Sequence, residues 1–386
     1  MENAELDSVN KKRLLLFIAI AYGVSFLMMI PMYIGKQKGI DITQIVDAQM
    51  CSPAAGVALG FLVFYKGEKR VPKMFMTVLV VNYVVQLVLG LMSVFANPFG
   101  PEDVFDFSRI PGLAESMDAS TMETLQAAMP LQQVYYLIGQ YALILGSVFL
   151  WIGYFTARRE RRKFAGLSRN NEGRGILLVL MFTGLYIVRI FAPAILKGIF
   201  TNSLAEILAV NADGLKELVK NPVFYVLLVN LPFNYPMVII AFFGEEYGWR
   251  YFLQPIMQKK FGMKLGVILL GIVWGLWHLP VDTMFYTEDS IPQMIVGQII
   301  ACVFMGIFLG YAYLKTNNIW IPVCMHFLNN NLVAVFSGAD SDAIFQDQHV
   351  TWLNLVEIAI VCVVVFGLFI FTKEYKEKKV EEALDA

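Results

Sequence analysis

The chain has 386 residues, of which 58% are hydrophobic and only 16% charged, with 30 basic and 31 acidic side chains. Its mean hydropathy is +0.60, and so apolar a chain cannot cover its hydrophobic surface in water. These values exclude a soluble enzyme, a disordered protein and a nucleic-acid binder, and they predict an integral membrane protein.

The predicted membrane spans follow one another along the whole chain. Apolar runs of roughly 20 residues, the length that crosses the hydrocarbon core of a bilayer, recur about ten times. The first run follows Lys11, Lys12 and Arg13, is too long for a signal-peptide core and lacks an A-x-A cleavage site, so we interpret it as a retained span. The predicted spans are 14–34, 45–65, 74–95, 131–155, 175–200, 230–256, 264–284, 292–314, 319–336 and 351–372.

The charges in the connecting segments predict how these spans are oriented. If alternate ends are cytoplasmic, most of the 30 Lys and Arg residues fall on that side, with the richest cluster in the connector 158–174. The acidic, proline-containing segment 97–130 is predicted to be an external loop, and 203–220 a helix along the outer surface. The expected fold class is all-α, a polytopic membrane helix bundle of about ten transmembrane helices with both termini cytoplasmic.

Three of the predicted spans carry polar groups that are costly inside a membrane and are functional candidates for that reason. At about 1.5 Å per residue, all of these groups lie roughly 12 to 21 Å from the nearest cytoplasmic loop, so the three helices bring them to one depth. The polar groups form the patterns Glu245-Glu246-x-x-x-Arg250 in the sixth span, Trp274-x-x-x-His278 in the seventh and His326-x-x-x-Asn330 in the ninth.

The spacing of these residues suggests a division of labour. Glu246 and Arg250 lie four residues apart on one helical face and can pair, while Glu245 projects about 100° away. Glu245 is then free to hold and deprotonate a water, because a buried ion pair alone would leave this second carboxylate unexplained. With neutral hydrogen-bonding groups available opposite to stabilise an oxyanion, the pattern predicts amide hydrolysis within the membrane.

Two other charged residues in the spans receive no catalytic role. Arg189 in the fifth span is interpreted as a residue that extends to the interface or pairs structurally. Asp282 lies near the outer end of the seventh span, where a charge costs little. We therefore expect neither residue at the site.

The sequence resembles the CAAX protease and bacteriocin-processing family of intramembrane proteases, also called the CPBP or Abi family. The resemblance covers residues 230–336 and rests on the three motifs, which stand in the family's order on consecutive core helices with one extra span before the third. This chain has Trp274 where the family commonly has Phe, an exchange that we expect to leave the chemistry unchanged. The roles implied by the resemblance are water activation by Glu245 and His278, oxyanion stabilisation by His326 and Asn330, and orientation of the base by Glu246 and Arg250.

The resemblance also raises the question of a metal, because members of the family are often called metalloproteases. In the zinc alternative, the ligands would be Glu245, His278 and His326. The H-E-x-x-H pattern is absent, however, and no third histidine is within reach. Water attack driven by a glutamate needs no further ligand, so we favour no cofactor and keep zinc as the alternative.

The motifs divide the chain into three predicted regions. Residues 1–174 form an N-terminal four-helix membrane region without an assigned role, 175–336 the protease core, and 337–386 an outer loop, the last transmembrane helix and a charged cytoplasmic tail. The predicted function is that of an intramembrane endopeptidase of the cell membrane. Its substrates would be membrane-associated or hydrophobic peptides, either of the CAAX type or of the bacteriocin or peptide-pheromone type.

Partners and competing functions follow from the same residues. We expect a peptide or protein substrate at the membrane and the lipid bilayer as partners, and no nucleic acid; the sequence predicts no oligomeric state. One alternative is a non-proteolytic regulator or bacteriocin-immunity protein of the same fold, which would not need the complete motifs. A second is a proton-coupled transporter, but we find no inverted repeats in the sequence.

Overall fold

The computed structural model describes residues 2–95, 120, 131–337, 346 and 348–376. Throughout this part of the chain the secondary structure is helical, and no strand occurs in it. The predicted all-α helix bundle is therefore confirmed. The predicted external loop at 97–130 lies outside the described residues except for Ser120, and so does the tail from residue 377.

The N-terminal part begins with one long, interrupted helix. A π-helical turn at Ala19–Val24 and a short break after Leu27 divide this helix into segments. The elements of this part are α1 (Glu2–Ile18), η1 (Ala19–Val24), α2 (Ser25–Leu27), α3 (Met29–Gln37), α4 (Thr43–Phe64), α5 (Lys73–Phe95), α8 (Leu131–Thr156) and the short α9 (Arg159–Phe164).

The C-terminal part starts with two long helices joined by a third. Helix α12 begins at Pro222, and the Asn221 side chain caps it by accepting a hydrogen bond from the Val223 N–H at 3.0 Å. The elements are α10 (Glu172–Phe200), α11 (Leu204–Lys220), α12 (Pro222–Glu246), η3 (Tyr247–Leu253), α13 (Gln254–Phe261), α14 (Met263–Trp277), α15 (Leu279–Val281), η4 (Asp282–Tyr286), α16 (Ile291–Thr316), α17 (Trp320–Ser337), α19 (Trp352–Val365), η5 (Gly367–Phe371) and η6 (Lys373–Tyr375).

Eight helical segments within the described residues are long and apolar enough to cross a membrane, and each coincides with a predicted span. The two remaining predicted spans also form helices but fall outside this set. Helix α17 carries three consecutive asparagines, and α19 has only 14 residues before the chain continues in 3₁₀ turns. The protein is therefore a polytopic helical membrane protein, and its orientation relative to the cytoplasm stays a prediction.

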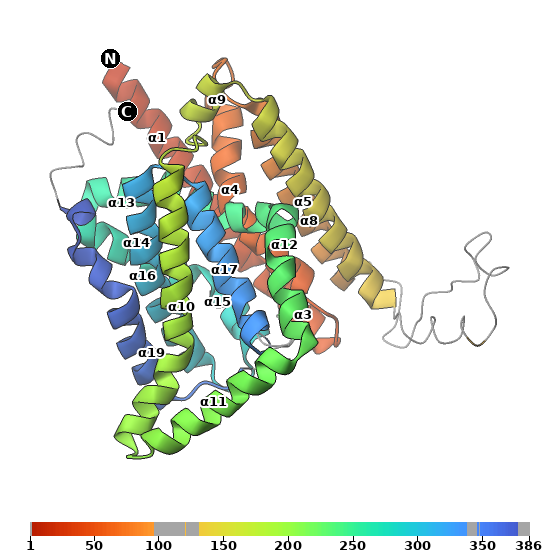
Figure 1. Ribbon diagram of the computed structural model, residues 1–386. Helices are drawn as coiled ribbons and strands as arrows, with labels where there is room; N and C mark the ends of the chain where they lie inside the picture. Colours follow the sequence, from red (N-terminus) through yellow and green to blue (C-terminus); the bar gives the residue numbers. More distant parts are fainter. Residues whose placement is uncertain (1, 96–119, 121–130, 338–345, 347, 377–386) are drawn as a thin grey trace.

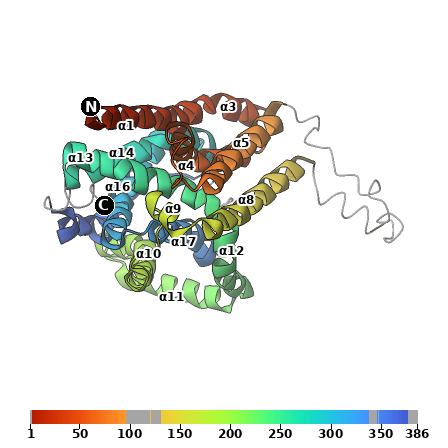
Figure 2. The same cartoon turned by 90° about the horizontal axis from the view of Figure 1, so that it is seen from above.

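The helices are arranged so that basic and amphipathic elements occupy opposite ends of the bundle. The start of α1 and helix α9 lie at one end, and α11 crosses the other end, where it joins α10 to α12 (Figure 1). No residue of α11 is buried, which fits the predicted surface helix at 203–220. Seen from above, α1 and α3 form one edge of the bundle and α11 the opposite edge, with α14, α16 and α17 between them (Figure 2).

Glycines allow the helices that carry the motifs to approach their neighbours closely, as small residues do in membrane bundles. A Cβ atom at Gly244 would lie 2.4 Å from the backbone carbonyl oxygen of Met50 on α4. On α14, a Cβ at Gly271 would lie 2.4 Å from the Cα of Val303 on α16. The motif-bearing helices are therefore fixed against α4 and α16 by contacts that reach the backbone.

Contacts with the N-terminal part cross the predicted boundary at residue 174. The Trp277 indole N–H donates to the carbonyl oxygen of Ala21 at 2.7 Å, and the Gln49 amide donates to the carbonyl oxygen of Trp277 at 2.8 Å. The Tyr22 hydroxyl donates to the carbonyl oxygen of Val273 at 2.8 Å. The N-terminal helices thus support α14 directly, while the division into three regions stays a prediction.

We expect Gly244→Ala to destabilise the protein by roughly 1–3 kcal/mol, because the added methyl group forces α12 away from α4. Thermal unfolding of the purified protein in detergent measures this effect. Gly184→Ala on α10 is the control, since no atom lies within 4 Å of a Cβ built at Gly184. Equal unfolding temperatures for the two variants would contradict the close packing at Gly244.

Candidate active site

The three motifs meet around the side chain of Trp274. Its indole N–H donates to Oε2 of Glu245 at 2.8 Å, and its backbone carbonyl accepts a hydrogen bond from Nδ1 of His278 at 2.9 Å. The ring packs edge-on against His326 with a centroid distance of 5.7 Å. The structure therefore brings together predicted site residues from α12, α14 and α17.

Glu246 forms the second half of the cluster. It lies at the end of α12 and is completely buried, as is Arg250 in the π-helical turn η3. Oε2 of Glu246 accepts from Nε of Arg250 at 2.9 Å, and Oε1 accepts from Nδ1 of His326 at 2.9 Å. The predicted pairing of Glu246 with Arg250 is confirmed, and both carboxylate oxygens of Glu246 have partners.

The hydrogen bonds determine which nitrogen of each histidine is available for chemistry. A carbonyl or carboxylate oxygen only accepts, so Nδ1 of His278 and Nδ1 of His326 must both carry protons. In a neutral His278, Nε2 then has a free lone pair that can accept a proton from water. Nε2 of His326 can donate only when the ring is an imidazolium. A neutral His326, as we expected it, therefore cannot donate to an oxyanion through Nε2 in this geometry.

Asn330 is oriented by a chain of polar side chains. Arg189 only donates, and it contacts Oδ1 of Asn329 at 3.0 Å, which leaves the Asn329 amide nitrogen to donate to Oδ1 of Asn330 at 2.9 Å. Because Oδ1 of Asn330 already accepts from Asn329, the amide N–H₂ of Asn330 is available to donate to another group. Arg189 therefore pairs within the protein, as predicted, but it does so through the residue next to Asn330.

Trp274 makes contacts at the site that a Phe in its place could not make. The indole N–H supplies a hydrogen bond to Glu245 that a phenyl ring cannot make. In addition, the guanidinium carbon of Arg250 lies 4.8 Å from the centroid of the Trp274 ring, within cation–π range. Trp274 therefore links the predicted base to the ion pair that lies behind it.

Trp274→Phe should lower the hydrolysis rate roughly 10- to 100-fold, because a hydrogen bond to a charged group contributes roughly 1.5–3 kcal/mol. Trp320→Phe is the matched control, since that indole donates to the carbonyl oxygen of Leu167 rather than to the site. Steady-state hydrolysis rates of the two variants, normalised to the amount of folded protein, measure the contribution of the Trp274 indole N–H. A loss of rate that is equal in both would refute the role of the indole N–H.

Asp282 lies in a more buried environment than we expected. It was expected near a helix end where a charge costs little, but its side chain is fully buried at the start of η4. Neither carboxylate oxygen has a hydrogen-bond partner among the described residues. Its backbone N–H donates to the carbonyl oxygen of His278 at 2.8 Å, which places it one helical turn after that residue. The signal in the sequence that could have indicated a buried position near the site was the spacing of four residues between His278 and Asp282.

The zinc alternative would use Glu245, His278 and His326 as ligands. Among the described residues, no group of three or more His, Cys, Asp or Glu side chains gathers as metal ligands would. Glu246 is occupied by Arg250 and His326, and one oxygen of Glu245 by Trp274. Glu245, Glu246 and the two histidines thus take part in a network of buried hydrogen bonds.

The fold and the cluster define a polytopic membrane protein with a buried carboxylate–histidine site. Residues 222–332 match the family model of type II CAAX prenyl endopeptidases, Rce1-like, and this segment contains all three motifs. A segment of 111 residues is 29% identical to CAAX prenyl protease 2 of Methanococcus maripaludis, covering 26% of this chain and 40% of that protein. No solved structure matches the chain significantly. Both matches are similarities of one segment of this chain to CAAX prenyl proteases.

Proposed function

We propose that the protein is an intramembrane endopeptidase that cleaves peptide bonds of membrane-associated or hydrophobic peptides. The observation that carries this proposal is the position of Glu245, which is 2% exposed, held by the Trp274 indole and separate from the Glu246–Arg250 ion pair. A carboxylate held in this way is suited to general-base chemistry. The chain spans two fifths of the length of the curated relative that it matches, so the activity of the whole protein is proposed here.

In the proposed reaction, a water molecule is held between Glu245 and Nε2 of His278. Glu245 takes one proton as the water oxygen forms a bond to the carbonyl carbon of the scissile amide, and the carbonyl oxygen becomes an oxyanion. The C–N bond then breaks, and the proton held by Glu245 passes to the leaving nitrogen. The products are a carboxylic acid and an amine, and Glu245 is returned to its initial state.

The oxyanion is stabilised by His326 and Asn330 in this proposal. The imidazolium of His326 donates through Nε2, while Glu246 accepts from its other nitrogen. Asn330 donates through its amide, whose orientation follows from Arg189 and Asn329. Glu246 is thus a positioning residue for His326 rather than a catalytic residue, and Arg250 holds Glu246.

Hydrolysis in H₂¹⁸O tests the proposal directly. The purified full chain in lipid vesicles is incubated with hydrophobic peptides that end in a prenylated cysteine followed by three residues, with unprenylated copies as the matched comparison. We expect one ¹⁸O atom in the new carboxyl group of the product, as detected by mass spectrometry. Absence of cleavage of both peptide sets by folded protein, together with unchanged membrane proton flux, would favour the regulator alternative. Peptide-independent proton flux would favour the transporter.

We also propose that the reaction needs no metal. Activity should stay within twofold of its starting value after stringent chelation, and the purified protein should hold far less than one zinc per chain. The reason is that Glu246 already accepts from Arg250 and His326, and one oxygen of Glu245 accepts from the Trp274 indole. Activity that disappears on chelation and returns with stoichiometric zinc would overturn this and assign Glu245, His278 and His326 as ligands.

The fold and the basic helix α9 also bear on where the protein resides and how it is oriented. We propose that the protein resides in the cell membrane, that its candidate active site is open to the cytoplasm, and that substrates arrive from the bilayer. The end of the bundle that carries α9 is then the cytoplasmic end, because α9 holds the densest cluster of basic residues.

A further inference from the structure

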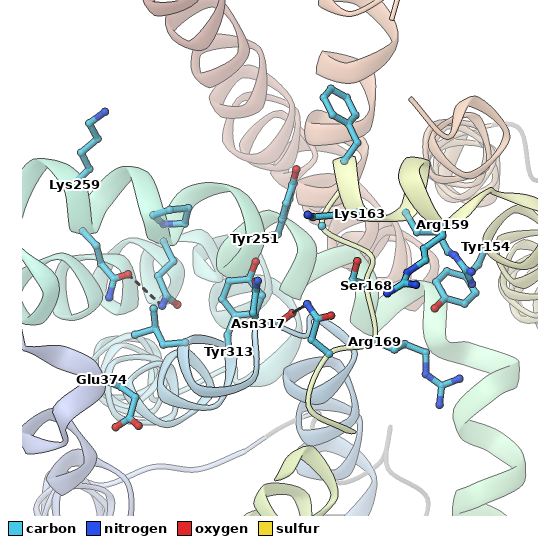
Figure 3. A pocket seen from close by; sticks show the side chains of 18 of the residues that line it. Tyr154, Arg159, Lys163, Ser168, Arg169, Tyr251, Lys259, Tyr313, Asn317 and Glu374 are labelled. Atoms are coloured by element: carbon cyan, nitrogen blue, oxygen red, sulfur yellow. Dashed lines mark hydrogen bonds between the residues drawn. The ribbon is translucent and has the colours of Figure 1, made fainter. Parts of the chain in front are cut away.

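A cavity with a volume of about 980 Å³ lies at the end of the bundle that carries α9. It is formed by α9 and the segment that follows it, by α13, and by the end of α16. Arg159 and Lys163 lie on the α9 side of the cavity and Lys259 on the opposite, α13 side (Figure 3). None of the residues proposed to act in catalysis lines it, so this cavity is separate from the candidate active site.

The charge of the cavity is strongly positive. Its basic lining residues are Arg159, Arg162, Lys163, Arg169 and Lys259, and its acidic one is Glu374.

Most of these charges have no acidic partner. Arg169 pairs with Glu172 at 2.5 Å, and Glu374 lies 3.7 Å from Lys315. Among the described residues, Arg159 and Lys163 form no ion pair with an acid, although they stand four residues apart on one face of α9. Two unpaired cations that face one hollow are an electrostatic match for an anion.

Helix α9 is held rigidly in this position. It ends in a Schellman motif, in which Leu167 N–H donates to the carbonyl oxygen of Arg162 at 2.8 Å and Gly166 N–H to that of Lys163 at 3.1 Å. Gly166 has φ of 67°, and a Cβ atom there would lie 2.1 Å from the Tyr251 ring, so only glycine fits. The cations are therefore presented by a fixed turn and not by a free segment.

The segment after α9 is also fixed to the helices of the bundle. The Tyr247 hydroxyl donates to the carbonyl oxygen of Ala165 at 2.7 Å, and the Trp320 indole donates to that of Leu167 at 3.1 Å. Both donors belong to elements next to the candidate active site, η3 and α17. The cavity wall is thus preorganised by buried hydrogen bonds.

An exposed apolar side chain at the end of α8 lines the cavity. Phe155 lines it, is 66% exposed, and lies at the end of α8. From Phe155 a stripe of exposed apolar side chains continues along one face of α8 at helical spacing, away from the cavity. The stripe consists of Phe155, Ile152, Val148, Leu145 and Tyr141.

We propose that the cavity binds the phosphate-bearing headgroup of an anionic phospholipid, whose acyl chains lie along the α8 stripe. Arg159 offers a planar pair of donors to phosphate oxygens, and Lys163 offers a compact positive charge. Basic pockets between membrane helices at the cytoplasmic side suit such headgroups. The lipid-facing stripe favours a phospholipid over a soluble phosphate or a peptide carboxylate, because only a lipid occupies the cavity and the stripe together.

Native mass spectrometry of the full chain in detergent tests this, with phosphatidylglycerol and phosphatidylcholine as the lipid probes. We expect phosphatidylglycerol to bind at least tenfold more tightly. Because each cation near the membrane surface contributes roughly 1 kcal/mol, R159Q/K163Q should weaken that binding roughly 30-fold. The matched control R158Q/R161Q removes two charges from the same segment at residues that do not line the cavity, and it should change binding less than threefold.

Several outcomes would overturn the proposal. Equal weakening by the two double variants would mean a diffuse surface charge, and equal affinity for the two lipids would mean no headgroup site. Displacement of phosphatidylglycerol by inorganic phosphate at similar concentration would assign a soluble anion instead. Displacement by a hydrophobic peptide with a free carboxyl terminus would assign a substrate contact. If a double variant unfolds, the single variants Lys163→Gln and Arg161→Gln make the same comparison.

Discussion

Glu245→Gln is expected to abolish peptide hydrolysis while the protein still inserts and folds. Glutamine has nearly the same size as glutamate, and its carbonyl oxygen still accepts the hydrogen bond from the Trp274 indole. It cannot, however, take a proton from water. Because a general base contributes roughly 10²- to 10⁴-fold to a rate, the loss should lie in that range or exceed it.

The control for this variant is Glu357→Gln. Glu357 lies on α19, so the same chemical change is made in another apolar helix away from the three motifs. Initial rates at saturating substrate and thermal unfolding are measured for both variants. Wild-type turnover in folded Glu245→Gln would remove Glu245 from the role of base, whereas a comparable loss in Glu357→Gln would show that the effect is general.

The sequence predicted those features of the site that depend on helical geometry alone. Glu246 and Arg250 are four residues apart, and any regular helix brings such residues together, so their ion pair could be expected. The common depth of the motifs was likewise predictable, because rise per residue is constant. The hydrogen bond between Glu246 on α12 and His326 on α17, 80 residues apart in the sequence, was not predicted, because rise per residue gives depth but not which helices are neighbours.

The features that were missed depend on side-chain contacts between helices. Spacing places Trp274 one turn before His278, but it does not show that the indole N–H reaches Glu245 on another helix. The protonated nitrogen of His326 likewise depends on which of its atoms faces Glu246. Distance from a helix end was a poor guide to the burial of Asp282, because the chain continues from α14 into η4 and keeps that carboxylate inside the bundle.

The bounds of several membrane spans were predicted closely, even for α4, which carries Asp47. Helices α4 and α16 agree with their predicted ranges to within a few residues. Helix α17 shows the limit of a hydropathy criterion, because the residues that give it a candidate function, His326 and the asparagines that follow, also lower its hydropathy. A functional helix of a membrane enzyme can therefore be the one whose sequence looks least like a span.

Asn330→Ala is expected to reduce the hydrolysis rate roughly 10²- to 10³-fold, the loss typical of removing one oxyanion donor. The structural reason is the orientation of its amide. Arg189 can only donate, so Asn329 must accept from it and donate to Oδ1 of Asn330, which leaves the Asn330 N–H₂ available as a donor. The effect should fall on kcat more than on KM, because the oxyanion exists only after the carbonyl has been attacked.

Asn331→Ala provides the matched control for this variant. Asn331 is the next residue of α17, and its amide donates to the backbone carbonyl of Phe327 at 2.9 Å, within its own helix. Its removal should change kcat less than threefold. Because an asparagine is a poor zinc ligand, a zinc enzyme would keep its metal content in Asn330→Ala, and chelation would still abolish whatever activity remained. Near-wild-type kcat in Asn330→Ala, or equal losses in the two asparagine variants, would exclude Asn330 as an oxyanion donor and leave that role to His326 alone.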